Sequence, residues 1–133
     1  MIKSLDHIAI PMQTVEPMLA FYRSLGFDVK EDLPGFFYSA CFGDNKINLH
    51  APALWQDPNF GLRGNTAVPG SADLCFVWDS SIEALQELLG QADAEIEEGP
   101  VERDGGRAGG MKGHSIYIRD PDRNLLEFIV YSS

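Results

Sequence analysis

The sequence predicts an α+β fold made of two copies of one unit, in which a strand is followed by a helix and three further strands. Segments with alternating apolar and polar residues, typical of half-buried strands, are interrupted twice by segments with apolar residues at helical spacing. The order of segments before Ala51 is repeated after Gly70. The 133 residues are therefore predicted to form one domain (1–133), with module one at 1–51, a linker at 52–70 and module two at 71–133.

Module one is predicted to contain four strands and one helix. Pro11 ends the first strand, and Thr14 and Gly26 bound the helix as its N-cap and its C-terminal stop. Pro34-Gly35 and Gly43-Asp44-Asn45 are typical of turns and separate the later strands. The predicted strands are 5–10, 27–33, 36–42 and 46–50.

Module two repeats this order after a linker rich in Pro and Gly. Ser80 and Glu83 are predicted to form a capping box at the start of its helix. The glycine-rich stretch 104–113 lacks the Gly-Lys-Ser or Gly-Lys-Thr end of a phosphate-binding loop, so it is either a lid over a site or a surface hairpin loop. The predicted strands are 72–78, 95–100, 114–118 and 125–131.

The net charge and the positions of the cysteines make several kinds of binding partner and metal site improbable. A net charge of −10 disfavours nucleic acid and membrane surfaces as partners. Cys41 and Cys75 lie in apolar strand-like segments outside any Cys-x-x-Cys pair, which argues against a zinc-thiolate site. The sequence has no signal-like leader and no apolar run long enough to cross a bilayer. We therefore expect a soluble cytoplasmic protein with a small-molecule partner.

Strand alternation places one polar side chain on the second face of each of four predicted strands. His7 and His50 hold these positions in module one, and Asp73 and Glu127 are their repeat equivalents in module two. A polar side chain within a sheet is costly unless it is paired or coordinated. Two imidazoles and two carboxylates match a divalent cation such as Zn, Ni, Co, Mn or Fe. The alternative for each residue alone is structural: a hydrogen-bonded core histidine, an edge glutamate or a capping aspartate.

Five segments carry a family resemblance: 5–10, 21–27, 41–50, 69–74 and 117–127. The last segment is the most specific, because an Asp-Pro turn leads into a strand with an inward glutamate. Together they resemble the vicinal oxygen chelate (VOC) superfamily, in its glyoxalase/bleomycin-resistance/dioxygenase-like branch, and most of all small glyoxalase domain-containing proteins. The resemblance implies two paired βαβββ modules that form a cup-shaped mixed sheet around a divalent metal, commonly in a homodimer.

The resemblance also implies site residues and a reaction. Metal ligands on the first, fourth, fifth and eighth strands correspond to His7, His50, Asp73 and Glu127. The implied enzyme is a metal-dependent lyase or isomerase that acts on a small carbonyl or thiol-adduct substrate through an enediolate, with a thiol such as glutathione as cosubstrate. Glu127 is then the catalytic base. Lactoylglutathione lyases usually have histidine at the Asp73 position, so the ligand set is either all four residues or the other three.

A metal-independent small-molecule sequestration protein of the bleomycin-resistance type is the main alternative to an enzyme. A thiol transferase or a dioxygenase ranks lower, because dioxygenases of this superfamily are usually longer. Three further residues are expected to contact the substrate: Tyr117, Asn48 and Arg103. Tyr117 shares a strand face with Ser115, Asn48 shares one with His50, and Arg103 is a basic residue beside the glycine-rich stretch.

Overall fold

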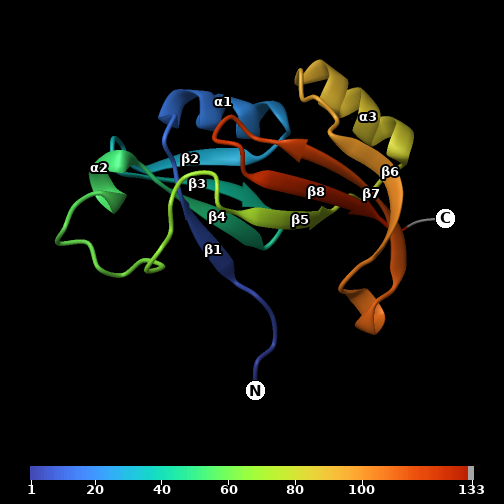
Figure 1. Ribbon diagram of the computed structural model, residues 1–133, viewed down its shortest axis with the longest axis horizontal. Coiled ribbons are helices and arrows are strands. Elements are labelled where there is room, and N and C mark those ends of the chain that lie inside the picture. The colour runs from blue at the N-terminus through green and yellow to red at the C-terminus, as the bar shows by residue number, and fades with distance from the viewer. Residues whose placement is uncertain (132–133) are drawn as a thin grey trace. The chain divides into compact units, whose positions relative to one another are not determined.

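A computed structural model describes residues 1–131 of the chain and divides it between Ser71 and Ala72 into two compact units. Each unit contains one four-stranded mixed sheet and one helix of ten residues (Figure 1). The predicted α+β fold class is therefore confirmed, and so is the repeated order of strand, helix and three strands.

In the first unit the strand order is β1-β4-β3-β2. β1 pairs with β4 in parallel, whereas β4, β3 and β2 form an antiparallel meander. The elements are β1 (His7–Pro11), α1 (Val15–Ser24), β2 (Asp28–Leu33), β3 (Phe37–Phe42) and β4 (Asn45–His50).

Helix α1 forms because its apolar residues fall on one stripe and both of its ends carry suitable residues. Thr14 occupies the N-cap position, although its side chain makes no capping hydrogen bond. Gly26 has a φ of +95°, the left-handed conformation that ends helices, and few residues other than glycine adopt it readily. The helix lies against β2 and β3 and buries Met18, Leu19 and Tyr22.

The predicted linker 52–70 is not wholly irregular, because the short helix α2 (Pro52–Trp55) begins it. Pro52 favours this start, since its missing N–H costs nothing in the first helical turn. The Trp55 indole Nε1 donates a hydrogen bond to the carbonyl oxygen of Met12 at 2.9 Å. This bond fixes the beginning of the linker to the residue that follows β1.

In the second unit the strand order is β5-β8-β7-β6, with β5 and β8 parallel and the other pairs antiparallel. The elements are β5 (Asp73–Val77), α3 (Ile82–Gln91), β6 (Glu98–Asp104), β7 (Lys112–Arg119) and β8 (Leu125–Val130). The helix starts one residue later than predicted, because the hydroxyl of Ser81, not Ser80, accepts the capping bond from the Ala84 N–H. β6 also lies further along the chain than the predicted strand 95–100.

The glycine-rich stretch forms the hairpin connection between β6 and β7, and a single 3₁₀ turn, η1 (Arg107–Gly109), lies within it. The stretch is therefore a hairpin loop, and its role as a lid over a site stays a prediction. Among the described residues, no helix is long and apolar enough to cross a membrane.

A buried turn joins β7 to β8. Both carboxylate oxygens of Asp120 accept hydrogen bonds from Asn124, one from the backbone N–H at 2.9 Å and one from the side-chain amide at 2.8 Å. The Asn124 side-chain oxygen in turn accepts a hydrogen bond from the Ala72 N–H at 3.0 Å. The Asp-Pro motif thus fixes the starts of both β8 and β5, the two strands that carry Glu127 and Asp73.

The predicted alternation of faces is present in both sheets. In the first, Asn48 pairs with Ala9 and Ser39 on one face, while Leu49 on the other face is fully buried. In the second, Glu127 pairs with Cys75 and Tyr117, so these three side chains share one face. The neighbours of Glu127 in the chain, Leu126 and Phe128, are buried on the opposite face.

Candidate functional site

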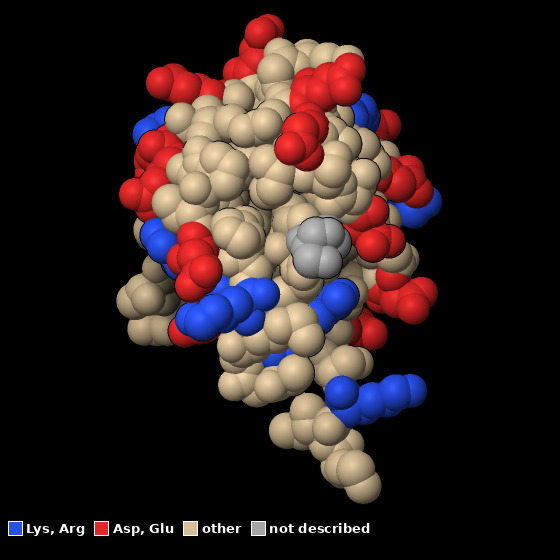
Figure 2. Space-filling view, turned by 90° about the vertical axis from the view of Figure 1, so that its right-hand side faces the viewer, with Lys and Arg blue, Asp and Glu red and all other residues tan. Residues whose placement is uncertain are grey.

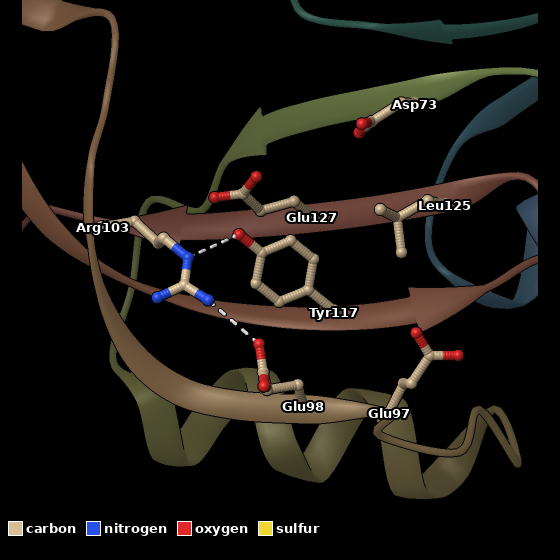
Figure 3. A pocket seen from close by; sticks show the side chains of 7 residues that line it. All are labelled: Asp73, Glu97, Glu98, Arg103, Tyr117, Leu125 and Glu127. Carbon is tan, nitrogen blue, oxygen red and sulfur yellow. Dashed lines mark hydrogen bonds and ion pairs between the residues drawn. The ribbon is translucent and has the colours of Figure 1, made fainter.

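The shared face of β5, β8 and β7 forms one wall of a cavity of about 450 Å³ in the second unit. Figure 3 shows the side chains of Glu127, Tyr117 and Asp73 extending into the same space. Of the sequence-predicted site residues, this cavity brings four together: Asp73, Glu127, Tyr117 and Arg103. The full lining is Asp73, Glu97, Glu98, Arg103, Tyr117, Leu125 and Glu127.

The Glu127 carboxylate is held by a short hydrogen bond. The hydroxyl of Ser115, which is fully buried on β7, donates to Glu127 Oε2 at 2.6 Å. Hydrogen bonds to a carboxylate are roughly twice as strong as those between neutral groups, so this bond restricts the rotamer of Glu127. Ser115 holds only one carboxylate oxygen, and the Tyr117 hydroxyl and the Cys75 thiol also lie within hydrogen-bonding range of this carboxylate.

Arg103 and Tyr117 form a second fixed group in the cavity. The Arg103 Nε donates to the Tyr117 hydroxyl oxygen at 3.0 Å, and Nη2 binds Glu98 at 3.0 Å. The guanidinium carbon also lies 5.5 Å from the centroid of the Tyr117 ring, within cation–π range. Because Arg103 occupies a lone pair of the phenol oxygen, the Tyr117 O–H proton is free to point at Glu127 or at a bound molecule.

The electrostatics keep the Tyr117 hydroxyl protonated. Burial and the negative charge of Glu127 raise its pKa above the ordinary value, and the Arg103 hydrogen bond opposes them only in part. Arg103 is itself held in the charged form, since the bond to Tyr117 and the charge of Glu98 raise its pKa. Tyr117 is therefore a hydrogen-bond donor at neutral pH.

The carboxylates of the cavity differ in whether a cation neutralises them. Glu98 is paired with Arg103, and Glu97 is paired with Arg119 at 3.1 Å, which lowers the pKa of Glu97. Asp73 and Glu127 have no ion-pair partner among residues 1–131. These two side chains therefore carry the available negative charge of the site.

Sequence reasoning missed three residues that line this cavity, Glu97, Glu98 and Leu125, and also missed Cys75 beside Glu127. Cys75 pairs with Glu127 across β5 and β8. The residue as a whole is exposed, but desolvation of its thiol against the sheet, followed by the charge of Glu127, raises the pKa of the thiol to about 12. Its shared parity with Asp73 could have revealed it. Glu97 and Glu98 had no such signal, because they lie in a segment that was predicted only as a short, poor strand.

The remaining predicted residues lie in the first unit. His50 is buried and packs against two aromatic rings, with centroid distances of 5.5 Å to Phe37 and 5.4 Å to Phe60. Burial and the positive charge of Arg63 lower the pKa of His50, so the imidazole is neutral at pH 7. It lies on the face predicted for it, paired with Pro11 and Phe37.

His7 lies on the same face as His50 but far from it along the strands. His7 pairs with Lys46, four positions before His50, which corresponds to about 13 Å of strand. Its Nδ1 donates to the Asp6 carboxylate at 2.7 Å. Both imidazoles project from the same face of the sheet. Even with metal–nitrogen bonds of roughly 2 Å, they would reach one ion only if both side chains lay flat along the strands.

The predicted metal-ligand set therefore does not fit a single ion through both histidines of this sheet. In the part of the chain that the structure describes, no three His, Cys, Asp or Glu side chains are grouped as a metal site requires. The donor types suit a divalent cation, but their register does not bring both imidazoles together.

Asn48 is the third predicted substrate contact, and it has an unusual environment. It is only 8% exposed, and its side-chain oxygen has no hydrogen-bond partner among the described residues. A buried carbonyl oxygen without a partner costs about 1–3 kcal/mol. A ligand that donates a hydrogen bond to this oxygen would remove that cost, and a contact between Asn48 and the substrate stays a prediction.

Comparison with known proteins places this arrangement in a family. Residues 4–128 match the family model described as Glyoxalase/Bleomycin resistance protein/Dioxygenase superfamily. The chain is 37% identical to virulence protein STM3117 of Salmonella typhimurium, over 98% of this chain and 85% of that protein. The crystal structure of that protein superposes with a TM-score of 0.84, covering 99% of both chains. Glyoxalase domain-containing protein RDO1 of Mycosarcoma maydis is 37% identical over 98% of this chain and 69% of its own length.

Two solved structures of lower identity share the fold. Lactoylglutathione lyase from Agrobacterium tumefaciens has a TM-score of 0.72 at 20% identity, covering 96% of this chain and 92% of that one. TnmS3, an antibiotic binding protein from Streptomyces sp. CB03234, has a TM-score of 0.71 at 22% identity, covering 98% of each. The fold thus accommodates both an enzyme and a binding protein. On the evidence of the family model and the two close relatives, this chain belongs to the glyoxalase/bleomycin resistance protein/dioxygenase superfamily.

Proposed function

We propose that the protein is a glyoxalase-like enzyme that isomerises a small carbonyl compound, or its thiol adduct, in the cavity of the second unit. One observation carries this proposal. The Glu127 carboxylate is held by Ser115 in a cavity that also presents the Tyr117 hydroxyl. A carboxylate without a cationic partner, next to a fixed O–H donor, is the pair of groups that proton transfer beside a carbonyl requires.

Glu127 acts as the base in this proposal. The carboxylate oxygen that Ser115 does not hold takes the proton from the carbon next to the substrate carbonyl, and the electron pair of that C–H bond moves toward the carbonyl oxygen. The Tyr117 O–H donates a hydrogen bond to this oxygen as negative charge develops on it. Glu127 then returns the proton to the former carbonyl carbon. The hydroxyl on the first carbon gives up its proton to the former carbonyl oxygen and becomes the new carbonyl, so the reaction is an isomerisation without net gain or loss of atoms. Arg103 positions Tyr117 through its 3.0 Å bond.

A divalent metal ion, when bound, would supply a Lewis acid for the same substrate oxygen. Because the register separates His7 from His50, no step is assigned to an ion held by both. Metal binding and the use of a thiol such as glutathione stay predictions. The homodimer implied by the family resemblance is also part of this proposal, and sedimentation velocity tests it directly.

The test is the isomerisation of the methylglyoxal–glutathione adduct by wild-type protein and by Glu127→Gln, each assayed with and without added divalent metal. General-base catalysis contributes about 10²- to 10⁴-fold, so kcat should fall by that factor while KM changes little. Glu102→Gln is the matched control, because Glu102 is an exposed carboxylate on β6 that does not line the cavity. Unchanged kcat in Glu127→Gln would refute the assignment of the base.

A metal-independent binding protein is the second candidate, and a feature of the first unit favours it. A neutral His50 between Phe37 and Phe60, with the unpartnered amide oxygen of Asn48 two residues away, suits an uncharged aromatic ligand. Aromatic ligands that bind without turnover, with affinity lost in Asn48→Leu and retained in Glu127→Gln, would favour this candidate.

A further inference from the structure

A second cavity lies at the other end of the same face of the sheet in the second unit. Its volume is about 330 Å³, a size that suits a small organic molecule. Tyr131, which follows β8, lines it and is four residues beyond Glu127, about 13 Å along the strand. The cavity is therefore separate from the one that contains Glu127. Its lining is Val77, Trp78, Asp79, Ser80, Arg107 and Tyr131.

The β6–β7 hairpin is packed tightly against Tyr131. A Cβ atom at Gly105 would overlap the Tyr131 hydroxyl, so only glycine allows the backbone this close an approach. The Gly105 N–H donates to the Met111 carbonyl at 2.8 Å and closes the hairpin loop. The Arg107 backbone N–H lies 3.5 Å from the Tyr131 hydroxyl oxygen. These contacts hold the loop, and with it Arg107, at the cavity.

Arg107 brings a positive charge to the cavity that no carboxylate of the described chain neutralises. Its guanidinium carbon lies 5.1 Å from the centroid of the Tyr131 ring, so the side chain is stacked on the ring. Within residues 1–131 no Asp or Glu lies within ion-pair distance of it. A guanidinium fixed by stacking presents several N–H donors in one plane, the geometry that matches a carboxylate.

The remaining walls supply an aromatic surface and a negative charge. The Trp78 indole is fixed, because its Nε1 donates to the Ser81 carbonyl at 3.0 Å. Trp78 and Tyr131 therefore present two aromatic side chains to one cavity. Asp79 lines the same space and has no ion-pair partner among residues 1–131. An acidic and a basic side chain that share a cavity without pairing suit a molecule that carries both charges.

We propose that this cavity binds a zwitterionic amino acid with a planar aromatic side chain. Arg107 binds the carboxylate, Asp79 accepts from the ammonium group, and Trp78 and Tyr131 contact the ring. The proposed isomerisation does not use this cavity, so a failed test of the amino-acid site leaves the proposed reaction unaffected, and the reverse also holds.

The test is isothermal titration calorimetry of the full-length protein with L-tryptophan, tryptamine and indole-3-propionate. These probes share the indole ring, but tryptamine lacks the carboxylate and indole-3-propionate lacks the amine. L-tryptophan should bind more tightly than either. Arg107→Gln should weaken L-tryptophan and indole-3-propionate by about tenfold, the usual scale for a charge-assisted hydrogen bond, and leave tryptamine unchanged. Asp79→Asn should weaken L-tryptophan and tryptamine and leave indole-3-propionate unchanged.

Lys112→Gln is the matched control, because Lys112 is a cation of the same hairpin that pairs with Asp104 and does not line the cavity. It should bind L-tryptophan as wild type does. The proposal is overturned if L-tryptophan gives no saturable heat at millimolar concentration, or if Arg107→Gln weakens all three probes equally. Arg107 and Asp79 are both exposed, so Arg107→Gln and Asp79→Asn should each keep the wild-type unfolding midpoint and remain testable.

Discussion

The buried turn between β7 and β8 offers the sharpest test of how the site is built. Asp120 is 2% exposed and Asn124 is 1% exposed. Replacing Asp120 with Ala removes two acceptor oxygens and leaves the Asn124 backbone N–H and side-chain amide without those partners. It should also loosen the Asn124 contact with Ala72, where β5 begins.

The expected loss follows from these contacts. A hydrogen bond to a charged group contributes about 1.5–3 kcal/mol, and the lower value is appropriate here because Ala also avoids burying a charge. Two such bonds give a loss of about 3 kcal/mol in the free energy of unfolding. At about 2.1 cal/mol/K per residue, the unfolding entropy of a chain of this length converts this loss to a fall in Tm of about 10 °C.

Thermal unfolding followed by circular dichroism measures this change. The matched comparison is a double-mutant cycle with Asn124→Ala. The coupling energy should be about 1.5 kcal/mol, because Asn124→Ala removes the side-chain bond to Asp120 but keeps the backbone N–H that makes the other bond. Urea unfolding of the same four proteins gives an independent value. A fall in Tm of less than about 2 °C in Asp120→Ala, or strictly additive effects in the cycle, would refute the argument.

Three further predictions concern single side chains. The Cys75 thiol, with a pKa of about 12, should react with iodoacetamide at pH 8 about 10³-fold more slowly than an unperturbed thiol. Glu127→Gln should speed that reaction, because the carboxylate contributes to the raised pKa. The lowered pKa of His50 means that the folded state binds its proton less readily than the unfolded state. Stability from this residue is therefore complete above about pH 6.5 and is lost as the pH falls below that value, and His50→Gln should flatten the pH dependence of unfolding between pH 7.5 and 5. Elemental analysis of protein purified without a chelating tag tests metal binding, and only one of His7→Gln and His50→Gln should lower the metal content, because the register keeps the two imidazoles apart.

The faces of the strands could be predicted from sequence because the pleat has a strict period of two residues. Together with the apolar face of each strand, that period predicted a shared face for Glu127 and Asp73, and the family resemblance added Tyr117. The structure places all three in one cavity. The period carries no information on how far one strand is shifted past its neighbour. The offset between His7 and His50 depends on backbone pairing between β1 and β4, which no local pattern encodes.

β6 shows a second limit of local patterns. Gly99 and Pro100 lie near its start and weaken strand propensity, so the sequence predicted only a poor strand that ended there. Pairing with β7 instead extends the strand to Asp104. This extension places Arg103 beside Tyr117, a contact between residues 14 positions apart that depends on the hairpin register.

In each unit the strand that comes first in the chain pairs in parallel with the strand that comes last, β1 with β4 and β5 with β8. This pairing has a consequence for the order in which the strands of each sheet come together during folding. His7 meets Lys46 across 39 positions of chain, and Asp73 meets Leu125 across 52, whereas the other pairings join consecutive strands. Closing long loops costs more entropy, so the three-stranded meanders should form early and β1 and β5 should dock last. Both late strands are also edges of their four-stranded sheets, since among residues 1–131 each is paired with one strand of its own sheet. Their amide protons should therefore exchange with solvent deuterium sooner than those of β4 and β8, and the strand that carries Asp73 should be the most readily released part of the Glu127 cavity.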